Sequence, residues 1–250
     1  MMQGLVRSLA RPCGRPLDPR GCKGVRSALR KHISTGSLRG SAVPMTFTKH
    51  SEPRRSGGSR QPPLIIMHGL MGSKMNWKSM AKAIATKTGR EVYTVDARNH
   101  GDSPHTDAHS YPLLAADLLL FMQQHSIPTA ALMGHSMGGR AVMAAALTEP
   151  SVIEKLLVLD ISPIGTSKSI SSLPRFLEIM RRVTLPPDLT PQEARKHVDD
   201  LLKPAVAEPS IRQFLLTNLT QTPAGDGYMW KVNVEGIARN FNPQGLNLPP

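Results

Sequence analysis

The chain has 250 residues, of which 40% are hydrophobic and 20% charged. This length fits one domain, or one domain with an insert, and the apolar fraction is sufficient for a buried core. No apolar stretch reaches the roughly 18 residues that a membrane span needs, because Asp117 interrupts the longest one at 113–122, so no transmembrane segment is expected. The two cysteines, Cys13 and Cys22, are too few for a disulfide scaffold.

The net charge of +13 belongs mainly to the N-terminal part of the chain. Residues 1–60 hold 13 Lys and Arg against 2 Asp and Glu, whereas residues 61–250 hold 18 against 16. A nucleic-acid-binding domain carries its basic side chains on the folded surface, so this distribution argues against a nucleic acid partner.

Residues 1–40 are rich in Arg, contain several Ser and hold a single acidic residue, Asp18. This composition is typical of a mitochondrial transit peptide, and the segment lacks the apolar core of a secretory signal. We therefore expect a mitochondrial protein, located in the matrix; a disordered basic tail without a targeting role is the alternative. Both cysteines lie in this leader, so its removal would exclude a Cys nucleophile and a Cys-based metal site.

Short apolar runs alternate with helix-length stretches from residue 64 onward. The runs cover 64–67, 92–96, 129–133 and 156–160, the helical stretches cover 74–88, 111–125 and 137–148, and a short edge strand is expected at 45–48. The four runs lack polar alternation, as expected for strands covered on both faces. The pattern predicts an α/β fold with a mainly parallel sheet and helices on both faces.

The character of the chain changes after residue 163. Residues 164–238 are polar, helical and punctuated by prolines, with no buried-strand run, and we interpret them as a helical cap over the strand ends. The expected organisation is therefore a basic leader at 1–40, an α/β core at 41–163, a cap at 164–238 and a disordered tail at 239–250.

The sequence Gly-His-Ser-Met-Gly at 134–138 follows the third apolar run and opens a helix of small residues. A Gly-x-Ser-x-Gly motif between a strand and a helix is typical of a nucleophile elbow, in which the glycines allow a tight turn that presents the Ser. Ser136 is the candidate nucleophile. A dinucleotide-binding turn is excluded because Ser136 stands where that motif has its middle glycine.

The loop at 68–72, His-Gly-Leu-Met-Gly, follows the first apolar run. Elbow enzymes take one oxyanion-binding N–H from this loop and one from the residue after the nucleophile, which nominates the backbone N–H groups of Leu70 and Met137. His68 precedes the nucleophile along the chain, and we interpret it as structural rather than catalytic.

Residues 96–103 form a polar turn after the second strand. A metal site built from His100, His105 and His109 is the alternative to a solvated loop, but no Cys or carboxylate pair stands at ligand spacing, so the solvated loop is the preferred interpretation. No metal and no cofactor are expected.

Several motifs together resemble the α/β-hydrolase superfamily and, within it, a mitochondrial serine hydrolase. They lie at 68–69, 96–103, 134–139, 160–163, 215–219 and 230–233, and the resemblance covers about residues 45–240. It implies a carboxylic-ester hydrolase that acts on lipid-like esters such as diacylglycerol. It also suggests the 2-oxoglutarate dehydrogenase complex as a partner.

Two residues are candidates for the acid of a Ser-acid-His triad. Asp160 ends a strand, where its carboxylate could face the strand-end site or simply bond the next turn. The resemblance points instead to the position just after 230–233, where this chain has Glu235, whose other interpretation is a solvated cap residue. Both candidates stay open.

The general base is missing from the expected place. His197 is the one His that follows Ser136, and it lies in a charged helical stretch where a solvated role is favoured. In the family the remaining strands and the catalytic His follow the cap, whereas this chain ends at Pro250. We therefore expect a shortened form, and the alternative function is a catalytically impaired protein that only binds.

Overall fold

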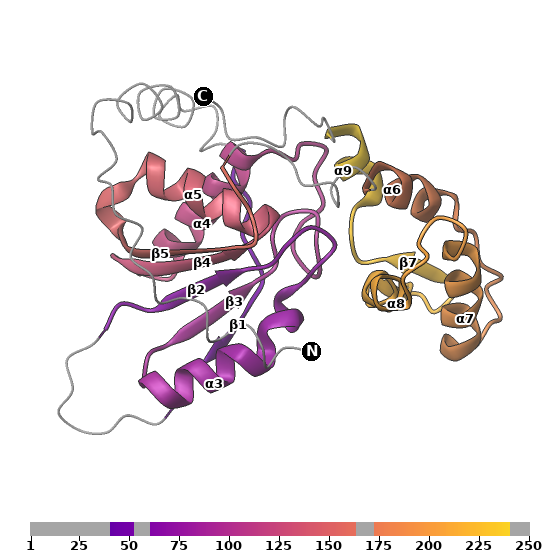
Figure 1. Cartoon of the computed structure of the whole chain (residues 1–250), viewed down its shortest axis with the longest axis horizontal. Coiled ribbons are helices and arrows are strands. Elements are labelled where there is room, and N and C mark those ends of the chain that lie inside the picture. Colours follow the sequence, from indigo (N-terminus) through magenta and orange to yellow (C-terminus); the bar gives the residue numbers. More distant parts are fainter. Residues whose placement is uncertain (1–40, 53–60, 164–172, 241–250) are drawn as a thin grey trace.

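The computed structural model describes residues 41–52, 61–163 and 173–240 (Figure 1). The predicted leader at 1–40 lies outside the described residues, as does 241–250, which holds most of the predicted tail. Within the described ranges, a sheet with flanking helices forms one part of the molecule, and a smaller group of helices and short strands forms the other (Figure 1).

Five strands form the main sheet in the order β1-β3-β2-β4-β5. The strands are β1 (Phe47–His50), β2 (Leu64–Met67), β3 (Val92–Val95), β4 (Ala130–His135) and β5 (Ile153–Leu159). β2 pairs in parallel with β3 and β4, β4 pairs in parallel with β5, and β1 is the antiparallel edge. The predicted α/β class with a mainly parallel sheet is confirmed.

Helices cover both faces of this sheet (Figure 1). They are η2 (Lys74–Trp77), α3 (Lys78–Thr88), α4 (Tyr111–Gln124), α5 (Met137–Thr148) and the short η3 (Pro150–Val152). α4 and α5 lie on one face and α3 on the other. The stretch 74–88, predicted as one helix, is therefore a 3-10 turn followed by an α-helix.

The central strand β2 shows why the apolar runs are continuous. All four of its residues are buried. Ile65 and Met67 pack with α4 and α5, whereas Leu64 and Ile66 pack with α3. Successive side chains of a strand point to opposite faces, so a strand between two helical layers needs apolar residues at every position.

Asp117, the residue that breaks the apolar run of α4, is fully buried. Its carboxylate accepts two hydrogen bonds from Arg98, from Nε and Nη2 at 2.6 Å each, and one from the Val43 backbone N–H at 2.8 Å. Burial raises the pKa of Asp117, and the Arg98 guanidinium opposes that shift. The pair ties the first described residues to the loop after β3.

The strand β5 differs from the prediction of a strand covered on both faces. Leu156 and Leu157 are 40% and 43% exposed. They are consecutive, so they point to opposite faces. β5 is the edge of the five-stranded sheet, and among the described residues little covers either leucine. The expectation of full burial is therefore wrong for this strand, because its apolar sequence does not reveal its place at the edge.

Residues 173–240 fold into a layer beside the strand ends. They form α6 (Leu173–Arg182), α7 (Pro191–Leu202), α8 (Pro209–Leu216), β6 (Leu219–Gln221), β7 (Tyr228–Trp230) and α9 (Val234–Asn240). The antiparallel pair β6–β7 was not predicted, since the cap was expected to be helical. Strands of three residues are too short to produce a recognisable apolar alternation.

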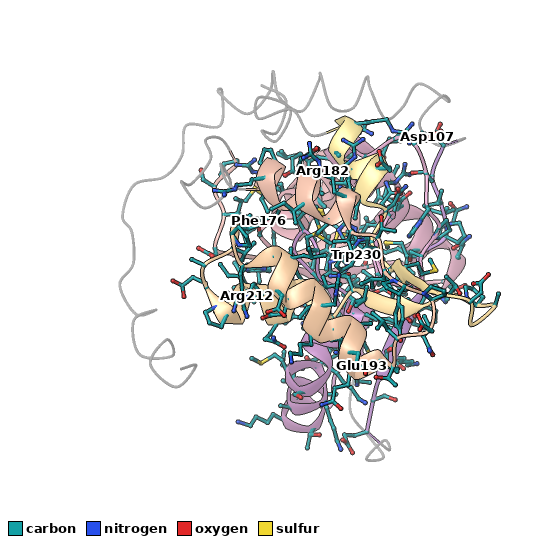
Figure 2. All side chains as sticks on the ribbon, turned by 90° about the vertical axis from the view of Figure 1, so that its right-hand side faces the viewer. Asp107, Phe176, Arg182, Glu193, Arg212 and Trp230 are labelled. Carbon is teal, nitrogen blue, oxygen red and sulfur yellow. The ribbon has the colours of Figure 1, made fainter. Side chains whose placement is uncertain are left out.

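This layer, called the cap below, has its own apolar core, which includes Phe176 and Leu216. Figure 2 looks onto the cap and shows Phe176 and Trp230 among its helices and strands. The Trp230 indole N–H donates to the Met180 carbonyl at 2.9 Å, which joins β7 to α6. The same apolar cluster contains Met71, from the loop after β2, so the cap packs directly on that loop.

Candidate active site

Ser136 sits at the turn between β4 and α5 with φ 51° and ψ −117°. Few residues other than glycine adopt such a backbone, which costs on the order of 1–3 kcal/mol and occurs mainly at functional sites. Its N–H donates to the Leu159 carbonyl at 3.0 Å, and its side chain is only half-buried. The predicted strand–turn–helix context of Ser136 is present.

The two elbow glycines are required by close packing. A Cβ on Gly134 would lie 2.6 Å from the Gly139 backbone nitrogen, and one on Gly138 would lie 2.5 Å from the His68 carbonyl oxygen. Both distances are below any that real Cβ atoms show, so a side chain at either position would displace backbone. The absence of side chains lets α5 begin directly against β2.

The loop after β2 lies beside the nucleophile. A Cβ on Gly69 would be 3.3 Å from the Ser136 Cβ, and the Gly72 N–H donates to the Gly69 carbonyl at 3.0 Å, which closes the loop into a turn. Leu70 lies inside that turn, and its N–H donates to no acceptor among the described residues. Met137 is the first residue of α5, so its N–H has no acceptor inside the helix. Leu70 and Met137 therefore both lie in segments beside Ser136, and their role as oxyanion donors stays a prediction.

Met71 holds this loop in place through two backbone bonds. Its φ is 61°, its N–H donates to His100 Nε2 at 3.2 Å, and its carbonyl accepts from the Asn218 side-chain amide at 2.8 Å. One bond comes from the loop after β3 and the other from the cap. The strained loop beside Ser136 is thus fixed from two sides.

His68 and His100 are both buried. Nδ1–H of His68 donates to the Gly69 carbonyl at 2.8 Å, and its Nε2 accepts from the Ala97 N–H at 3.1 Å. Nδ1–H of His100 donates to the Arg98 carbonyl at 2.9 Å. Burial lowers the pKa of both residues, well below the usual range for His100. With both ring nitrogens occupied, His68 has the structural role that was predicted for it.

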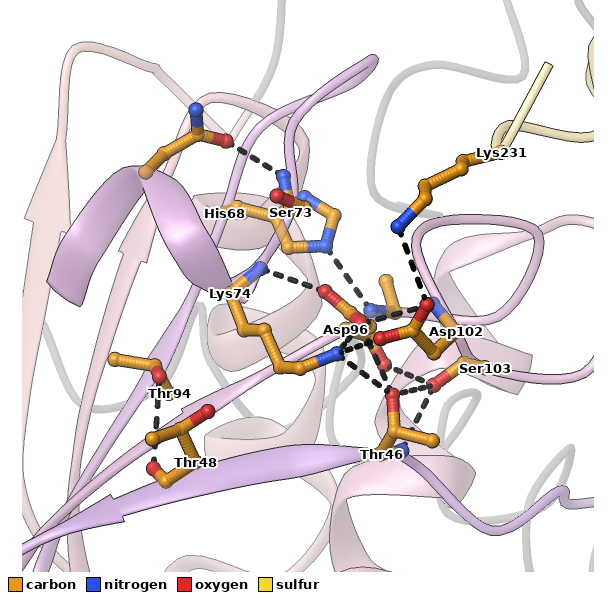
Figure 3. A network of polar contacts seen from close by, with 12 residues as sticks. Thr46, Thr48, His68, Ser73, Lys74, Thr94, Asp96, Asp102, Ser103 and Lys231 are labelled. Carbon is orange, nitrogen blue, oxygen red and sulfur yellow. Dashed lines mark hydrogen bonds and ion pairs between the residues drawn. The ribbon is translucent and has the colours of Figure 1, made fainter. Parts of the chain in front are cut away.

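Asp96 is the centre of a polar network that the sequence did not reveal (Figure 3). Its carboxylate is fully buried and accepts from the backbone N–H of Lys74 at 2.6 Å, from the Thr46 hydroxyl at 2.9 Å and from the Asp102 N–H at 3.0 Å. Lys74 Nζ forms an ion pair with it as well. The network joins the residue before β1, the start of η2 and the loop after β3.

This network was interpreted as a solvated polar turn, and that interpretation is wrong for Asp96, Asn99 and His100, all of which are fully buried. A buried carboxylate needs several donors. In the sequence these donors are spread over more than 50 positions, from Thr46 to Asp102, and only the tertiary fold brings them together.

The cap is joined to the core through the same loop. The Asn233 N–H donates to the Asn99 carbonyl at 2.9 Å, and its side-chain amide donates to the Asn99 side-chain oxygen at 3.0 Å. Lys231 Nζ lies 3.6 Å from the Asp102 carboxylate, and Arg239 pairs with Asp107 at 2.8 Å. The motif at 230–233 therefore positions the cap against the strand-end loops.

The two candidate acids lie in different surroundings. Asp160 follows β5 with φ 54°, its side chain is 91% exposed, and its carboxylate is 3.9 Å from His135 Nε2. Glu235 lies in the first turn of α9, where its carboxylate accepts from Arg181 Nε at 2.7 Å. No described hydrogen bond joins either carboxylate to Ser136, so the assignment of the acid stays a prediction.

His197, the one His after Ser136, is exposed on α7. Within the described ranges, no hydrogen bond joins it to Ser136. The three histidines considered for a metal, His100, His105 and His109, do not form a ligand set, and the residues that the structure describes contain no group of three His, Cys, Asp or Glu suited to a metal ion. The expected absence of a metal and a cofactor stays a prediction.

Comparisons with known proteins agree with this geometry. Residues 62–229 match the alpha/beta hydrolase fold family. The chain belongs to this family. Among solved structures, a marine microorganism esterase superposes with a TM-score of 0.71 at 32% sequence identity, which covers 82% of this chain and 74% of that chain.

Two curated relatives carry the same name. The chain is 43% identical over 186 residues to the sn-1-specific diacylglycerol lipase ABHD11 of Mus musculus, which covers 74% of this chain and 60% of the mouse protein. It is 39% identical over 220 residues to the protein of that name from Danio rerio, which covers 88% of this chain and 67% of the relative. The chain thus spans about 60% of the length of the mouse relative.

The structure also bears on the expected absence of a membrane span. Of the helices in the described parts of the chain, none combines the length and the apolar character needed to cross a bilayer.

Proposed function

We propose that this chain carries the nucleophile and the oxyanion site of a serine hydrolase that cleaves carboxylic esters. The observation that carries the proposal is the strained backbone of Ser136, half-buried at the N-terminus of α5 and beside the loop that holds Leu70. That backbone costs free energy, and it presents the Ser hydroxyl next to two unoccupied N–H donors.

The reaction would proceed in two acyl-transfer steps. The Ser136 Oγ attacks the ester carbonyl as its proton passes to a base, and the carbonyl oxygen becomes an oxyanion that accepts from the N–H groups of Leu70 and Met137. Collapse of this intermediate breaks the bond to the alcohol, which leaves with a proton, and an acyl-enzyme remains. Water then attacks the acyl-enzyme, which releases the carboxylic acid and restores the Ser hydroxyl.

A lipid-like acyl glycerol is the substrate class that we propose. Support comes from the names of the two curated relatives, both sn-1-specific diacylglycerol lipases. Support also comes from the loop beside Ser136, in which Leu70 and Met71 pack with the apolar core of the cap. An apolar wall beside the nucleophile favours an acyl chain over a charged substrate.

A second candidate function is binding without turnover. It is favoured by the position of His197, which is exposed on α7 and has no described hydrogen bond to Ser136. Loss of the base from a Ser-acid-His triad lowers turnover about a millionfold. In that case the elbow and the cap would hold an ester or acyl ligand and would not cleave it.

A fluorophosphonate probe separates the two functions, because it reacts with an activated Ser. We expect labelling of the folded chain that disappears in Ser136→Ala and persists in the control Ser151→Ala, an exposed Ser in η3. Folded protein that is not labelled would support the binding function. Asp160→Asn and Glu235→Gln then identify the acid, since only loss of the orienting carboxylate slows labelling.

We also propose a mitochondrial matrix location, directed by residues 1–40, and an association with the 2-oxoglutarate dehydrogenase complex. The support for the location is the Arg-rich composition of the leader, and the support for the partner is the resemblance to a mitochondrial serine hydrolase. Cell fractionation of the full chain and of a chain without residues 1–40 tests the location. Co-purification of the full chain with that complex tests the partner.

A further inference from the structure

The exposed surface of η2 and α3, on both flanks of its buried alanines, carries an unusual combination of side chains. They are Met75, Lys78, Met80, Lys82 and Lys87, called the lysine–methionine face below. Met75 and Met80 are 56% and 48% exposed, the highest values among the large apolar side chains of the described residues. α3 contacts the sheet through Ala81 and Ala85, which are buried on its opposite side.

Figure 1 shows α3 on the side of the sheet opposite α4 and α5. Its main neighbours among the described elements are β1, β3 and η2, all of which lie on its inner side or at its N-terminus. Among the described residues, no further helix or strand covers this face.

The lysine–methionine face is strongly positive. No Asp or Glu occurs in the sequence between Glu52 and Glu91. Within the described ranges, none of Lys78, Lys82 and Lys87 forms an ion pair. Glu91 pairs with Lys49 at 2.8 Å, whereas Glu52 accepts a hydrogen bond from the Thr86 hydroxyl of α3 at 2.7 Å and so brings one negative charge to this helix.

Basic side chains on the cap provide a contrast, because many of them are neutralised. Arg181 pairs with Glu235 at 2.7 Å, and Lys203 pairs with Asp200 at 2.5 Å. Within the described ranges, Arg175, Arg195 and Lys196 of the cap also form no ion pair, but on α3 no lysine at all is paired with an acid. A local excess of this kind attracts a polyanionic partner.

The methionines indicate which polyanion fits. A nucleic acid backbone is met by Lys and Arg together with polar or aromatic side chains, and exposed methionines would add little to that contact. Lysines flanking apolar side chains on one helix are typical of helices that lie on a membrane surface, where the apolar groups enter the headgroup–acyl boundary and the lysines meet anionic headgroups.

The position of the face relative to Ser136 supports the same partner. η2 begins just after the loop 69–72, and the Trp77 ring lies 6.3 Å from the ring of His135, the residue before the nucleophile. We infer that the lysine–methionine face docks the protein on an anionic lipid surface. The docking does not depend on the proposed function. The further step, in which this contact delivers a lipid ester to Ser136, does rest on it.

Vesicle flotation with the full chain tests the docking. The vesicles consist of phosphatidylcholine alone or of phosphatidylcholine mixed with phosphatidylglycerol. We expect binding to the mixed vesicles, and a triple variant Lys78→Gln, Lys82→Gln, Lys87→Gln to lower the partition coefficient about a hundredfold, or about fivefold for each lysine.

The matched control removes three exposed lysines elsewhere, in the variant Lys155→Gln, Lys196→Gln, Lys203→Gln. We expect this control to bind within about twofold of the unaltered chain, because its lysines lie on β5 and the cap. Equal loss in the two triple variants would show attraction by overall charge and would overturn the inference. So would full binding by the α3 variant, or the absence of vesicle binding, which would leave the face to an acidic protein or a nucleic acid.

Trp77 provides a readout that the basic leader cannot produce. The chain has two tryptophans, so Trp230→Phe leaves Trp77 as the sole emitter. We expect phospholipids brominated on their acyl chains to quench Trp77 when mixed vesicles are added, because Trp77 lies between Met75 and Met80. Binding without quenching would mean that the leader, and not η2 and α3, touches the bilayer, which would overturn the inference.

The fluorophosphonate probe, used without vesicles, keeps this inference separate from the proposed function. The α3 triple variant should be labelled at the same rate as the unaltered chain. Vesicle binding without labelling would retain the docking surface and reject the hydrolase. Labelling without vesicle binding would retain the hydrolase and reject the docking surface.

Discussion

Two aspartates that follow parallel strands have opposite surroundings. Asp96 follows β3, near the middle of the sheet, where its carboxylate is fully buried and accepts bonds from Lys74, Thr46 and Asp102 (Figure 3). Asp160 follows β5, at the edge of the sheet, where its carboxylate is 91% exposed. In the sequence both residues simply end an apolar run.

The difference lies in the neighbours that each strand end has. The end of β3 is flanked by β1 and β2, and the residue before β1, Thr46, and the first residue of η2, Lys74, both donate to Asp96. β5 pairs with β4 alone, so among the described residues only His135 approaches the Asp160 carboxylate. An aspartate at the end of an inner strand is therefore buried among donors, whereas the aspartate at the end of the edge strand is exposed to solvent.

The largest effect is expected from Asp96→Asn. All of the bonds to the Asp96 oxygens come from donors, so an amide nitrogen would face donors and Lys74 would lose its buried counter-charge. We expect the free energy of unfolding to fall by about 3–5 kcal/mol. Asp160→Asn is the matched change at the edge, and we expect a loss within about 0.5 kcal/mol. Urea denaturation measures the free energy of unfolding of both variants. Similar losses would contradict the difference drawn between the surroundings of Asp96 and Asp160.

Gly138→Ala should have the next largest effect. Its Cβ would lie 2.5 Å from the His68 carbonyl oxygen, which is backbone and cannot rotate away. We expect a loss of about 1–3 kcal/mol together with weaker fluorophosphonate labelling, because α5 must move away from β2. Gly227→Ala is the control, since nothing lies within 4 Å of its Cβ position. Unchanged labelling in Gly138→Ala would mean that the close approach of α5 does not position Ser136.

Lowering the pH should reduce the free energy of unfolding through the buried histidines before it protonates the surface carboxylates. Burial lowers the pKa of His68 and His100, and burial with the nearby Arg98 charge lowers the pKa of His109 to about 4. Below pH 6.5, the ordinary His pKa, the unfolded chain therefore binds more protons than the folded chain. The contribution of these histidines to stability should be complete above pH 6.5 and fall as the pH drops toward 4.

Surface carboxylates titrate in a separate window. Lys74 holds the pKa of Asp102 below its ordinary value of 3.8, so the contribution of Asp102 is lost only at lower pH. Unfolding by urea over a pH series measures the slope, and His109→Gln should flatten it. A stability that stays constant down to pH 4 would show that the buried histidines accept protons without cost.

The smallest effect is expected from Asp160→Gly. The φ of 54° at Asp160 is a left-handed conformation that glycine adopts readily, so glycine should relieve strain there. We expect stability to rise by less than about 1 kcal/mol, because glycine also increases the entropy of the unfolded chain. Differential scanning calorimetry can resolve such a change, and a clear loss of stability would indicate that the Asp160 carboxylate has a structural partner.

Much of the fold could be predicted because it depends on local patterns. The runs at 64–67 and 92–96 correspond to β2 and β3, and the glycines at 134 and 138 predicted the tight turn around Ser136. The hairpin β6–β7 could not be predicted, because its strands are short and depend on packing against the cap helices. The exposure of Leu156 could not be predicted either, since an edge strand and a central strand can have the same composition.

The sequence by itself determined which chemistry is present: a Ser between glycines, a His-Gly loop and a basic leader. Only the tertiary structure decided which polar groups are buried, because partners such as Thr46 and Asp102 are distant in the sequence and meet only when the strands pair. The same holds for the lysine–methionine face, whose exposure follows from which side of α3 packs on the sheet. Periodic patterns encode elements locally, whereas burial and charge balance arise from contacts between elements.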